Sequence, residues 1–130
     1  MSNSNDLQSL LKHLNPLLHA ATYCYVHVEY ENVGYNEISF CVVRENEGIT
    51  YIMSQQDADA NNLKYSFTGK LITLQVYSAL DALGLTMAVS TALTKASIPC
   101  NIIAGYHHDH LLVPEEKAAQ ALQVLNSLAT

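Results

Sequence analysis

The pattern of hydrophobic and polar positions changes its period in an orderly way between Lys70 and Leu128. Apolar residues first alternate with polar ones, as in a strand with two unlike faces, and then recur at helical spacing. Pro114 ends the last strand and suits the first turn of a helix, where its missing N–H has no partner to lose. The predicted elements are a strand at 72–76, a helix at 85–96, strands at 100–104 and 110–113 joined by a reversal at 105–108, and a helix at 114–128.

The N-terminal half predicts a different order. Asn5 is expected to cap a helix, with Gln8 completing a capping box, and Asn15 and Pro16 end it. Alternating apolar positions with two intervening turns then predict three strands. The predicted elements are a helix at 5–14, strands at 22–30, 38–42 and 49–53, turns at 32–34 and 46–48, a short helix at 55–62, and a linker at 64–70.

Three segments carry a resemblance to a known family. SALDALGLTMAVSTAL, IPCNIIAGYHHDHLLVP and RENEGITYIM resemble the DUF2241 family, small tandem ACT-domain proteins related to amino-acid sensor domains. The resemblance covers most of the chain. It implies an α+β fold of ferredoxin-like ACT domains, as two tandem intertwined units, 1–67 and 68–130, with antiparallel sheets and helices on one face. Each half has fewer elements than a complete β-α-β-β-α-β unit, so we expect the halves to share strands.

Composition narrows the range of partners. A net charge of −6 opposes binding to nucleic-acid phosphates. The start of the chain lacks a basic and apolar leader, and no apolar run reaches about 18 residues, so we expect a cytoplasmic protein without membrane contact. The three cysteines lie in apolar strand patterns without CxxC spacing. They are expected to be small buried hydrophobes.

No pattern in the sequence predicts catalysis. The chain has no GxSxG elbow, and it has neither of the glycine-rich motifs that hold dinucleotides or nucleoside triphosphates. None of the cysteines lies in a basic sequence context that would favour a reactive thiolate. We therefore expect neither enzymatic activity nor a cofactor.

The connection from Ser78 to Thr86 is the principal candidate site. It precedes a predicted helix whose first N–H groups and positive dipole end suit a carboxylate, and Gly84 permits close approach or a positive φ. Asn101 offers a carbonyl for an ammonium group. The alternative is that Ser78 and Asp81 only end a strand and cap the helix. The resemblance implies an amino acid bound at this loop. The predicted ligand-binding residues are Ser78, Asp81, Gly84, Leu85, Thr86 and Asn101.

The segment from His107 to His110 offers a second cluster of chemically active side chains. Strand alternation places His108 and His110 on one face and Asp109 on the other. A structural zinc site needs four convergent ligands, and no second cluster at suitable spacing accompanies this one. Hairpin hydrogen bonding or an interface contact is the simpler interpretation. Possible second contacts to a ligand are Glu47, which lies in a predicted turn, and His108, Asp109 and His110.

These observations predict a regulatory or sensor module that binds an amino acid or a similar small zwitterion without transforming it. A homodimer or higher homo-oligomer is expected, because incomplete sheets leave strand edges to be covered. Two alternatives remain open. One is a structural protein that builds a homo-oligomer without a ligand, and the other is a metal-binding protein that uses His107 to His110.

Overall fold

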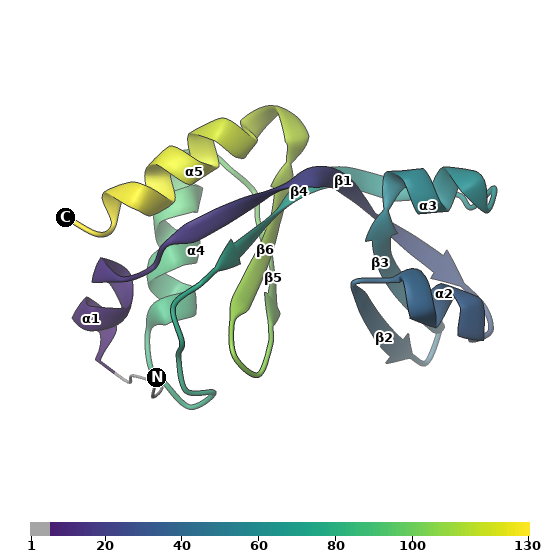
Figure 1. The fold of residues 1–130 in the computed structure, drawn as a ribbon, viewed down its shortest axis with the longest axis horizontal. Coiled ribbons are helices and arrows are strands. Elements are labelled where there is room, and N and C mark those ends of the chain that lie inside the picture. The colour runs from purple at the N-terminus through teal and green to yellow at the C-terminus, as the bar shows by residue number, and fades with distance from the viewer. Residues whose placement is uncertain (1–5) are drawn as a thin grey trace. The chain divides into compact units, whose positions relative to one another are not determined.

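The computed structural model describes residues 6–130 and divides the chain into two compact units. Unit 1 combines the N-terminal segment through His19 with Lys70–Thr130, and unit 2 is Ala20–Gly69. Two strands, β1 (Pro16–Val28) and β4 (Ser66–Leu74), begin in one unit and end in the other. Unit 1 is therefore built from both ends of the chain. Figure 1 shows the elements of both units in chain order.

Unit 1 contains a sheet with the strand order β1-β4-β6-β5. Strands β5 and β6 pair antiparallel, with Asn101 opposite Leu112 and Ala104 opposite Asp109. The elements that complete the unit are α1 (Leu7–Lys12), α4 (Leu85–Lys95), β5 (Asn101–Ala104), β6 (Asp109–Pro114), the 3-10 turn η1 (Glu115–Lys117) and α5 (Ala118–Ser127).

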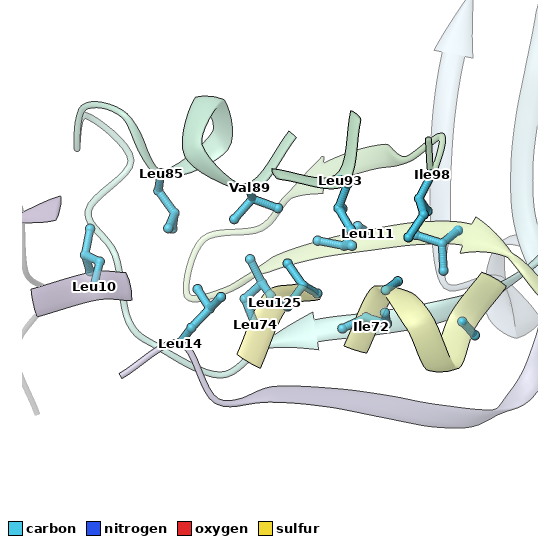
Figure 2. Packing of buried hydrophobic residues seen from close by; sticks show 13 residues of the cluster. Leu10, Leu14, Ile72, Leu74, Leu85, Val89, Leu93, Ile98, Leu111 and Leu125 are labelled. Atoms are coloured by element: carbon cyan, nitrogen blue, oxygen red, sulfur yellow. The ribbon is translucent and has the colours of Figure 1, made fainter. Parts of the chain in front are cut away.

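The core of unit 1 lies between one face of this sheet and its helices (Figure 2). The sheet contributes alternate residues, since Ile72 and Leu74 lie in the core while Thr73 between them does not. Leu10 and Leu14 reach the same core from the N-terminal segment, with 0% and 1% of their surfaces exposed. The other buried members are Leu85, Val89, Leu93, Ile98, Leu111, Val113, Ala118, Ala121 and Leu125.

Unit 2 has the strand order β2-β3-β1, and both pairings are antiparallel. Tyr51 lies at its centre with 0% of its surface exposed, and Cys24, Val26 and Met53 are buried beside it. The elements specific to this unit are α2 (Val33–Ile38), β2 (Cys41–Glu45), β3 (Gly48–Ser54) and α3 (Gln55–Ala60).

The structure corrects the strand predicted at 38–42. A short helix, α2, ends at Ile38, and β2 begins only at Cys41. The Asn32 side chain accepts a hydrogen bond from the Tyr35 backbone N–H at 3.1 Å, and this starts the helix. The buried Tyr51 hydroxyl holds the Asn32 backbone at 2.9 Å. Because Tyr51 is distant in sequence, local alternation alone could not indicate the helix.

The predicted linker at 64–70 is also corrected, because β4 already begins at Ser66. The Phe67 ring packs edge-to-face against Tyr25, with ring centroids 6.0 Å apart. Tyr65 packs against the core of unit 2. The segment is ordered by contacts with residues far away in sequence, which its own polar composition does not show.

At the N-terminus, the predicted helix is observed as α1, but it ends at Lys12 rather than near Leu14. The predicted Asn5 cap lies outside the described residues, and Asp6 occupies the N-cap position. In the C-terminal half the predicted order is confirmed. The reversal is closed by a bond from the Gly105 N–H to the His108 carbonyl at 2.9 Å, and Pro114 precedes η1 and α5.

We predict that Leu111→Ala lowers the free energy of unfolding by about 2–5 kcal/mol, because it leaves a cavity at a fully buried site. The control is Val33→Ala in unit 2, since the Val33 side chain is 71% exposed. Its effect should stay within about 0.5 kcal/mol. Urea denaturation followed by circular dichroism measures both. Equal losses in the two variants would contradict the assignment of the core.

Candidate functional site

The connection between β4 and α4 contains the principal site residues predicted from the sequence. Helix α4 begins at Leu85, and Gly84 is its N-cap with φ +95°. No side chain caps this helix, so neither Ser78 nor Asp81 acts as its cap. The first N–H groups of an uncapped helix lack intrahelical partners and lie at the positive end of its dipole. The beginning of α4 therefore presents donors suited to an anionic group.

Two roles were predicted for Gly84, a positive φ and close approach of a ligand, and the structure has the positive φ. Close approach requires open space next to the glycine. A Cβ built on Gly84 would lie 3.1 Å from Cδ2 of Leu7. The first residue of α1 thus packs directly over the glycine. A side chain at position 84 would meet both this contact and the strain of a left-handed backbone.

The other predicted site residues lie at different depths. Ser78 is half-buried, Asp81 and Thr86 are exposed, and Leu85 is a core residue with 4% of its surface exposed. Asn101 is exposed at the start of β5. The structure places Leu85, Thr86 and Asp109 around one recess, together with Leu74, Val89, Ile102 and Leu111. That recess is packed tightly, with a free volume of ≈ 0 Å³.

Apolar side chains around this loop were not singled out by the sequence. Leu80, Leu83 and Met87 are exposed by 69%, 84% and 73%. Leu80 and Leu83 precede α4 in the chain, and Met87 lies in its first turn. The sequence does contain a signal for them, because Leu80 and Leu83 are apolar residues within a predicted loop. A contiguous patch of exposed apolar groups is typical of surfaces that meet a partner, and these three residues are close together in the chain.

The histidines of the β5–β6 hairpin lie as strand alternation predicts. Asp109 borders the recess on the core side, whereas His110 bonds the Thr73 hydroxyl, through Nδ1, at 2.9 Å. Nε2 of His19 meets the same hydroxyl at 2.8 Å. Thr73 has one hydroxyl proton, so with both rings neutral it donates to one ring and accepts from the other. This His-Thr-His chain was not foreseen, because it joins three strands.

The hairpin tip stacks on the chain that follows β4. The His108 ring lies 4.9 Å from the Tyr77 ring at an interplanar angle of 20°, and its Nδ1 is 3.4 Å from the Val76 carbonyl. His107 makes edge contacts with Tyr77 and Tyr106. Through these contacts the two histidines pack the hairpin against the segment that follows β4. Among residues 6–130, no three His, Cys, Asp or Glu side chains converge on a position suited to a metal ion.

Burial changes the acidity of several groups in unit 1. It lowers the pKa of His110, and the nearby His108 and His19 lower it further. Burial raises the pKa of Asp109, against the opposing effect of His108. Burial also raises the pKa of the Cys100 thiol. In unit 2 it raises the pKa of Cys24 to about 11. The cysteines are free thiols, and these shifts disfavour the reactive thiolate.

Glu47 belongs to unit 2, in the turn between β2 and β3. Its side chain is exposed, and its backbone carbonyl accepts a hydrogen bond from Nε2 of His27 at 3.0 Å. The turn depends on Gly48, which has φ +138°. These contacts account for the hairpin turn between β2 and β3. They give no separate indication of a ligand.

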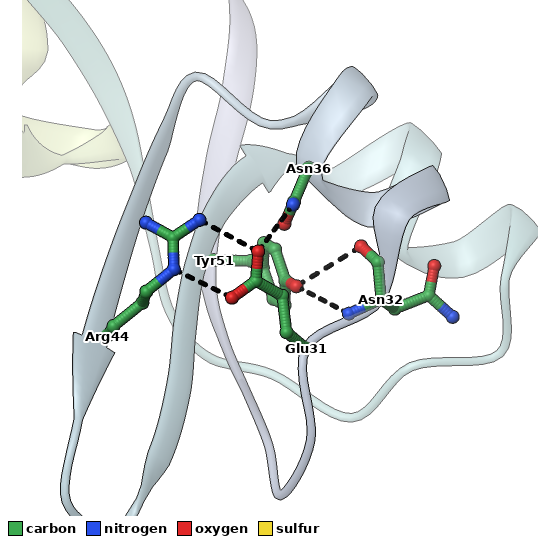
Figure 3. A network of polar contacts seen from close by, with 5 residues as sticks. All are labelled: Glu31, Asn32, Asn36, Arg44 and Tyr51. Carbon is green, nitrogen blue, oxygen red and sulfur yellow. Dashed lines mark hydrogen bonds and ion pairs between the residues drawn. The ribbon is translucent and has the colours of Figure 1, made fainter.

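A polar network in unit 2 centres on Glu31 (Figure 3). Arg44 donates to both carboxylate oxygens, at 2.7 and 2.8 Å, and Asn36 adds a third bond at 2.7 Å. Bonds from Arg44 and then Asn36 lower the pKa of Glu31 to about 2. The network joins the segment before α2 to the edge strand β2. Because it satisfies its charges internally, we assign it a structural role.

Comparison with known proteins identifies the class. Residues 2–70 match the ACT domain family, and residues 66–127 match a second ACT domain. This chain belongs to the ACT domain family, and its fold is that of two tandem ACT domains with antiparallel strands and helices. The matches do not extend to the narrower DUF2241 assignment, which stays a prediction. Neither match is to a catalytic family.

Solved structures give the same class. A Vibrio cholerae protein of unknown function, described as a possible transport protein, is 39% identical over 95% of this chain and 96% of its own, with a TM-score of 0.86. The ligand-free regulatory subunit of aspartate kinase from Thermus thermophilus is 6% identical over 89% of this chain and 97% of its own, with a TM-score of 0.66.

E. coli aspartokinase III, in complex with aspartate and ADP, is 16% identical over 87% of this chain and 32% of its own, with a TM-score of 0.63. At these identities, the two aspartate kinase structures share the fold with this chain. No curated protein matches it in sequence. Within the described part of the chain, no helix is both long and apolar enough to cross a bilayer.

The lowered pKa of His110 predicts a dependence of stability on pH. Since burial disfavours the charged imidazole, the unfolded chain takes up the proton first, near the ordinary value of 6.5. The His110 contribution is therefore complete above that value and is lost as the pH falls below it. Urea titrations measure the free energy of unfolding at pH 7.5 and at pH 5.5. The decrease between these two pH values should be smaller for His110→Asn than for the parent. His107→Asn, at an exposed hairpin position, is the control. A loss in His110→Asn as large as in the parent would contradict the prediction.

Proposed function

We propose that this protein is a regulatory module that binds an α-amino acid at the loop from Ser78 to Thr86 without transforming it. The observation that carries the proposal is the uncapped beginning of α4, where Gly84 is the N-cap and no side chain takes up the free N–H groups. A ligand carboxylate supplies the missing acceptors and gains from the helix dipole. In this arrangement a small anion takes the place of the cap.

The opposite charge of an amino acid has a candidate partner in the same loop. The Asp81 carboxylate is exposed and does not cap the helix. A carboxylate accepts hydrogen bonds from an ammonium group and attracts its charge. Donors on α4 and an acceptor at Asp81 together favour a zwitterion over a simple anion.

Family membership supports a regulatory role. The aspartate kinase proteins that share this fold include a regulatory subunit, and one of them was solved with aspartate bound. In that case the ligand belongs to a longer enzyme, of which this chain matches about a third. By analogy we propose that the present chain carries a sensing part.

The loop is also proposed to lie at an interface between copies. Leu80, Leu83 and Met87 are exposed around the beginning of α4, and burying them would remove apolar surface from water. A second copy covering this face would enclose the ligand and increase the strength of its polar contacts. The proposed assembly is a homodimer or a higher homo-oligomer.

We predict that one or more of the twenty common amino acids raises the melting temperature of the parent protein. Ligand at about 100 times its Kd adds about 2.7 kcal/mol of stability. Gly84→Ala should weaken binding at least about tenfold, because it strains φ and turns the Leu85 and Thr86 N–H groups away from the ligand. Asp81→Asn should weaken it as well. Thermal-shift screening followed by calorimetric titration measures both effects.

The matched control for this experiment is Gly34→Ala in unit 2. Gly34 has no positive φ, and a Cβ there would contact only the Asn32 side chain at 3.2 Å. This variant should bind as the parent does. If no amino acid stabilises the parent, the ligand class is wrong. If one binds equally well to a folded Gly84→Ala protein, the ligand lies elsewhere.

We further predict that the parent sediments as a dimer or larger species at micromolar concentration. Leu83→Asp introduces a charge into the proposed interface and should shift the equilibrium toward monomer. Ala104→Lys, on the exposed edge strand β5, tests sheet-edge pairing as the competing geometry. A monomeric parent across a wide concentration range in sedimentation equilibrium would exclude both geometries.

A further inference from the structure

A second cleft of unit 1 lies apart from the Ser78–Thr86 loop. It has a volume of ≈ 660 Å³, within the range of small-molecule sites. Its walls come from α1, from the C-terminal end of α5, and from the chain that follows β4, and Figure 1 shows α1 and this end of α5 on the same side of the unit. The lining residues that enter the argument are Leu10, Lys12, Asn15, Gln75, Tyr77 and Asn126.

The floor of this cleft is fixed before any ligand arrives. Leu10 is fully buried in the core, and Val76 packs against the same core. Two backbone bonds tie the walls together, from the Gln75 N–H to the Asn15 carbonyl at 3.4 Å and from the Val76 N–H to the Leu14 carbonyl at 3.3 Å. A preformed cleft spares a ligand the entropic cost of ordering the protein.

The charge of the cleft is opposite to that of the whole chain. Lys12 lines it, and no Asp or Glu is among its lining residues. His13 also lines it, but its Nδ1 donates to the Ser9 carbonyl at 2.9 Å. The two ion pairs of the described residues are Arg44 with Glu31 and Lys70 with Glu115, and neither involves Lys12. In a protein of net charge −6, Lys12 makes this cleft locally favourable for an anion.

Neutral polar groups make up most of the remaining polar wall. The amides of Asn15, Gln75 and Asn126 and the Tyr77 hydroxyl all border the cleft. The only bond between these side chains is from Asn15 Nδ2 to Gln75 Oε1, a long 3.4 Å. An amide offers both donors and acceptors, which matches hydroxyl groups, because each hydroxyl also donates and accepts. The cleft therefore suits a ligand with several hydroxyls.

The neighbouring helix end limits the ligand's charge. Asn126 and Ala129 lie at the C-terminal end of α5, where the dipole is negative. One carboxylate next to Lys12 is compatible with that field, whereas a doubly charged phosphate is opposed by it. The backbone carbonyls of Asn126 and Ser127 already accept bonds from the N–H groups of Ala129 and Thr130. Each of these carbonyls thus uses one of its two lone pairs within the helix end.

We propose that this cleft binds a polyhydroxylated carboxylate of the size of a six-carbon sugar acid. The carboxylate meets Lys12, the hydroxyls meet the amides of Asn15, Gln75 and Asn126, and the carbon chain lies against Val76 and the Tyr77 ring. The proposal concerns a different cleft and a different ligand from the amino-acid site, so either one stands without the other.

Calorimetric titration with four probes tests the ligand class. Gluconate has the carboxylate and the hydroxyls, glucose lacks the charge, hexanoate lacks the hydroxyls, and glucose 6-phosphate carries two negative charges. We expect gluconate to bind at least about tenfold more tightly than each of the others, the difference expected for a charge-assisted contact. No heat from gluconate at millimolar concentration, or tighter binding of any other probe, would overturn the proposal.

Variants locate the site. Lys12→Gln should weaken gluconate binding about tenfold, and Lys12→Arg, which keeps the charge, should restore most of it. Lys64→Gln removes the same charge from an exposed position of unit 2 and should leave binding unchanged. Gln75→Leu should weaken gluconate more than hexanoate, because only gluconate uses the amide. Equal gluconate affinity in the parent and in folded Lys12→Gln protein would place the ligand outside this cleft.

Discussion

Burial of Leu10 and Leu14 in the core of unit 1 is the interaction on which the remaining structure depends. Each side chain is at most 1% exposed, and burial of a leucine contributes about 1.5–3 kcal/mol. Their partners come from residues 72–125, so the N-terminal segment must close a long loop to reach them. Most of that loop folds as unit 2. The chain therefore inserts one compact unit between the two parts of the other.

This arrangement also places the groups proposed to bind ligands. Anchored by Leu10 and Leu14, α1 brings Leu7 against Gly84, so the N-terminal segment contacts the beginning of α4. The same helix carries Lys12 into the cleft beside α5. The two proposed sites differ in chemistry, because one uses the positive beginning of a helix and the other uses a lysine with neutral amides. Both depend on how firmly α1 is held.

Where the sequence prediction was wrong, long-range contacts decided the local structure. Helix α2 forms between the predicted turn and the predicted strand and includes Ile38, since the buried Tyr51 hydroxyl fixes Asn32, and Asn32 caps the helix. The segment from Ser66 to Lys70 looks like a linker by composition, yet it is strand, with Phe67 packed against Tyr25. Short elements have little propensity of their own, so tertiary partners readily override it.

The sequence alone determined the C-terminal order of elements, the reversal at Gly105, the opposite faces of Asp109 and His110, and the ACT class. Each of these rests on local periodicity, a turn residue or a family-specific segment. Only the tertiary structure decided that α1 belongs to the unit formed by the C-terminal half, that Leu7 covers Gly84, and that His19, Thr73 and His110 share one chain of hydrogen bonds. The physical reason is that periodicity shows which face of an element is buried, whereas its partners depend on packing between residues distant in the chain.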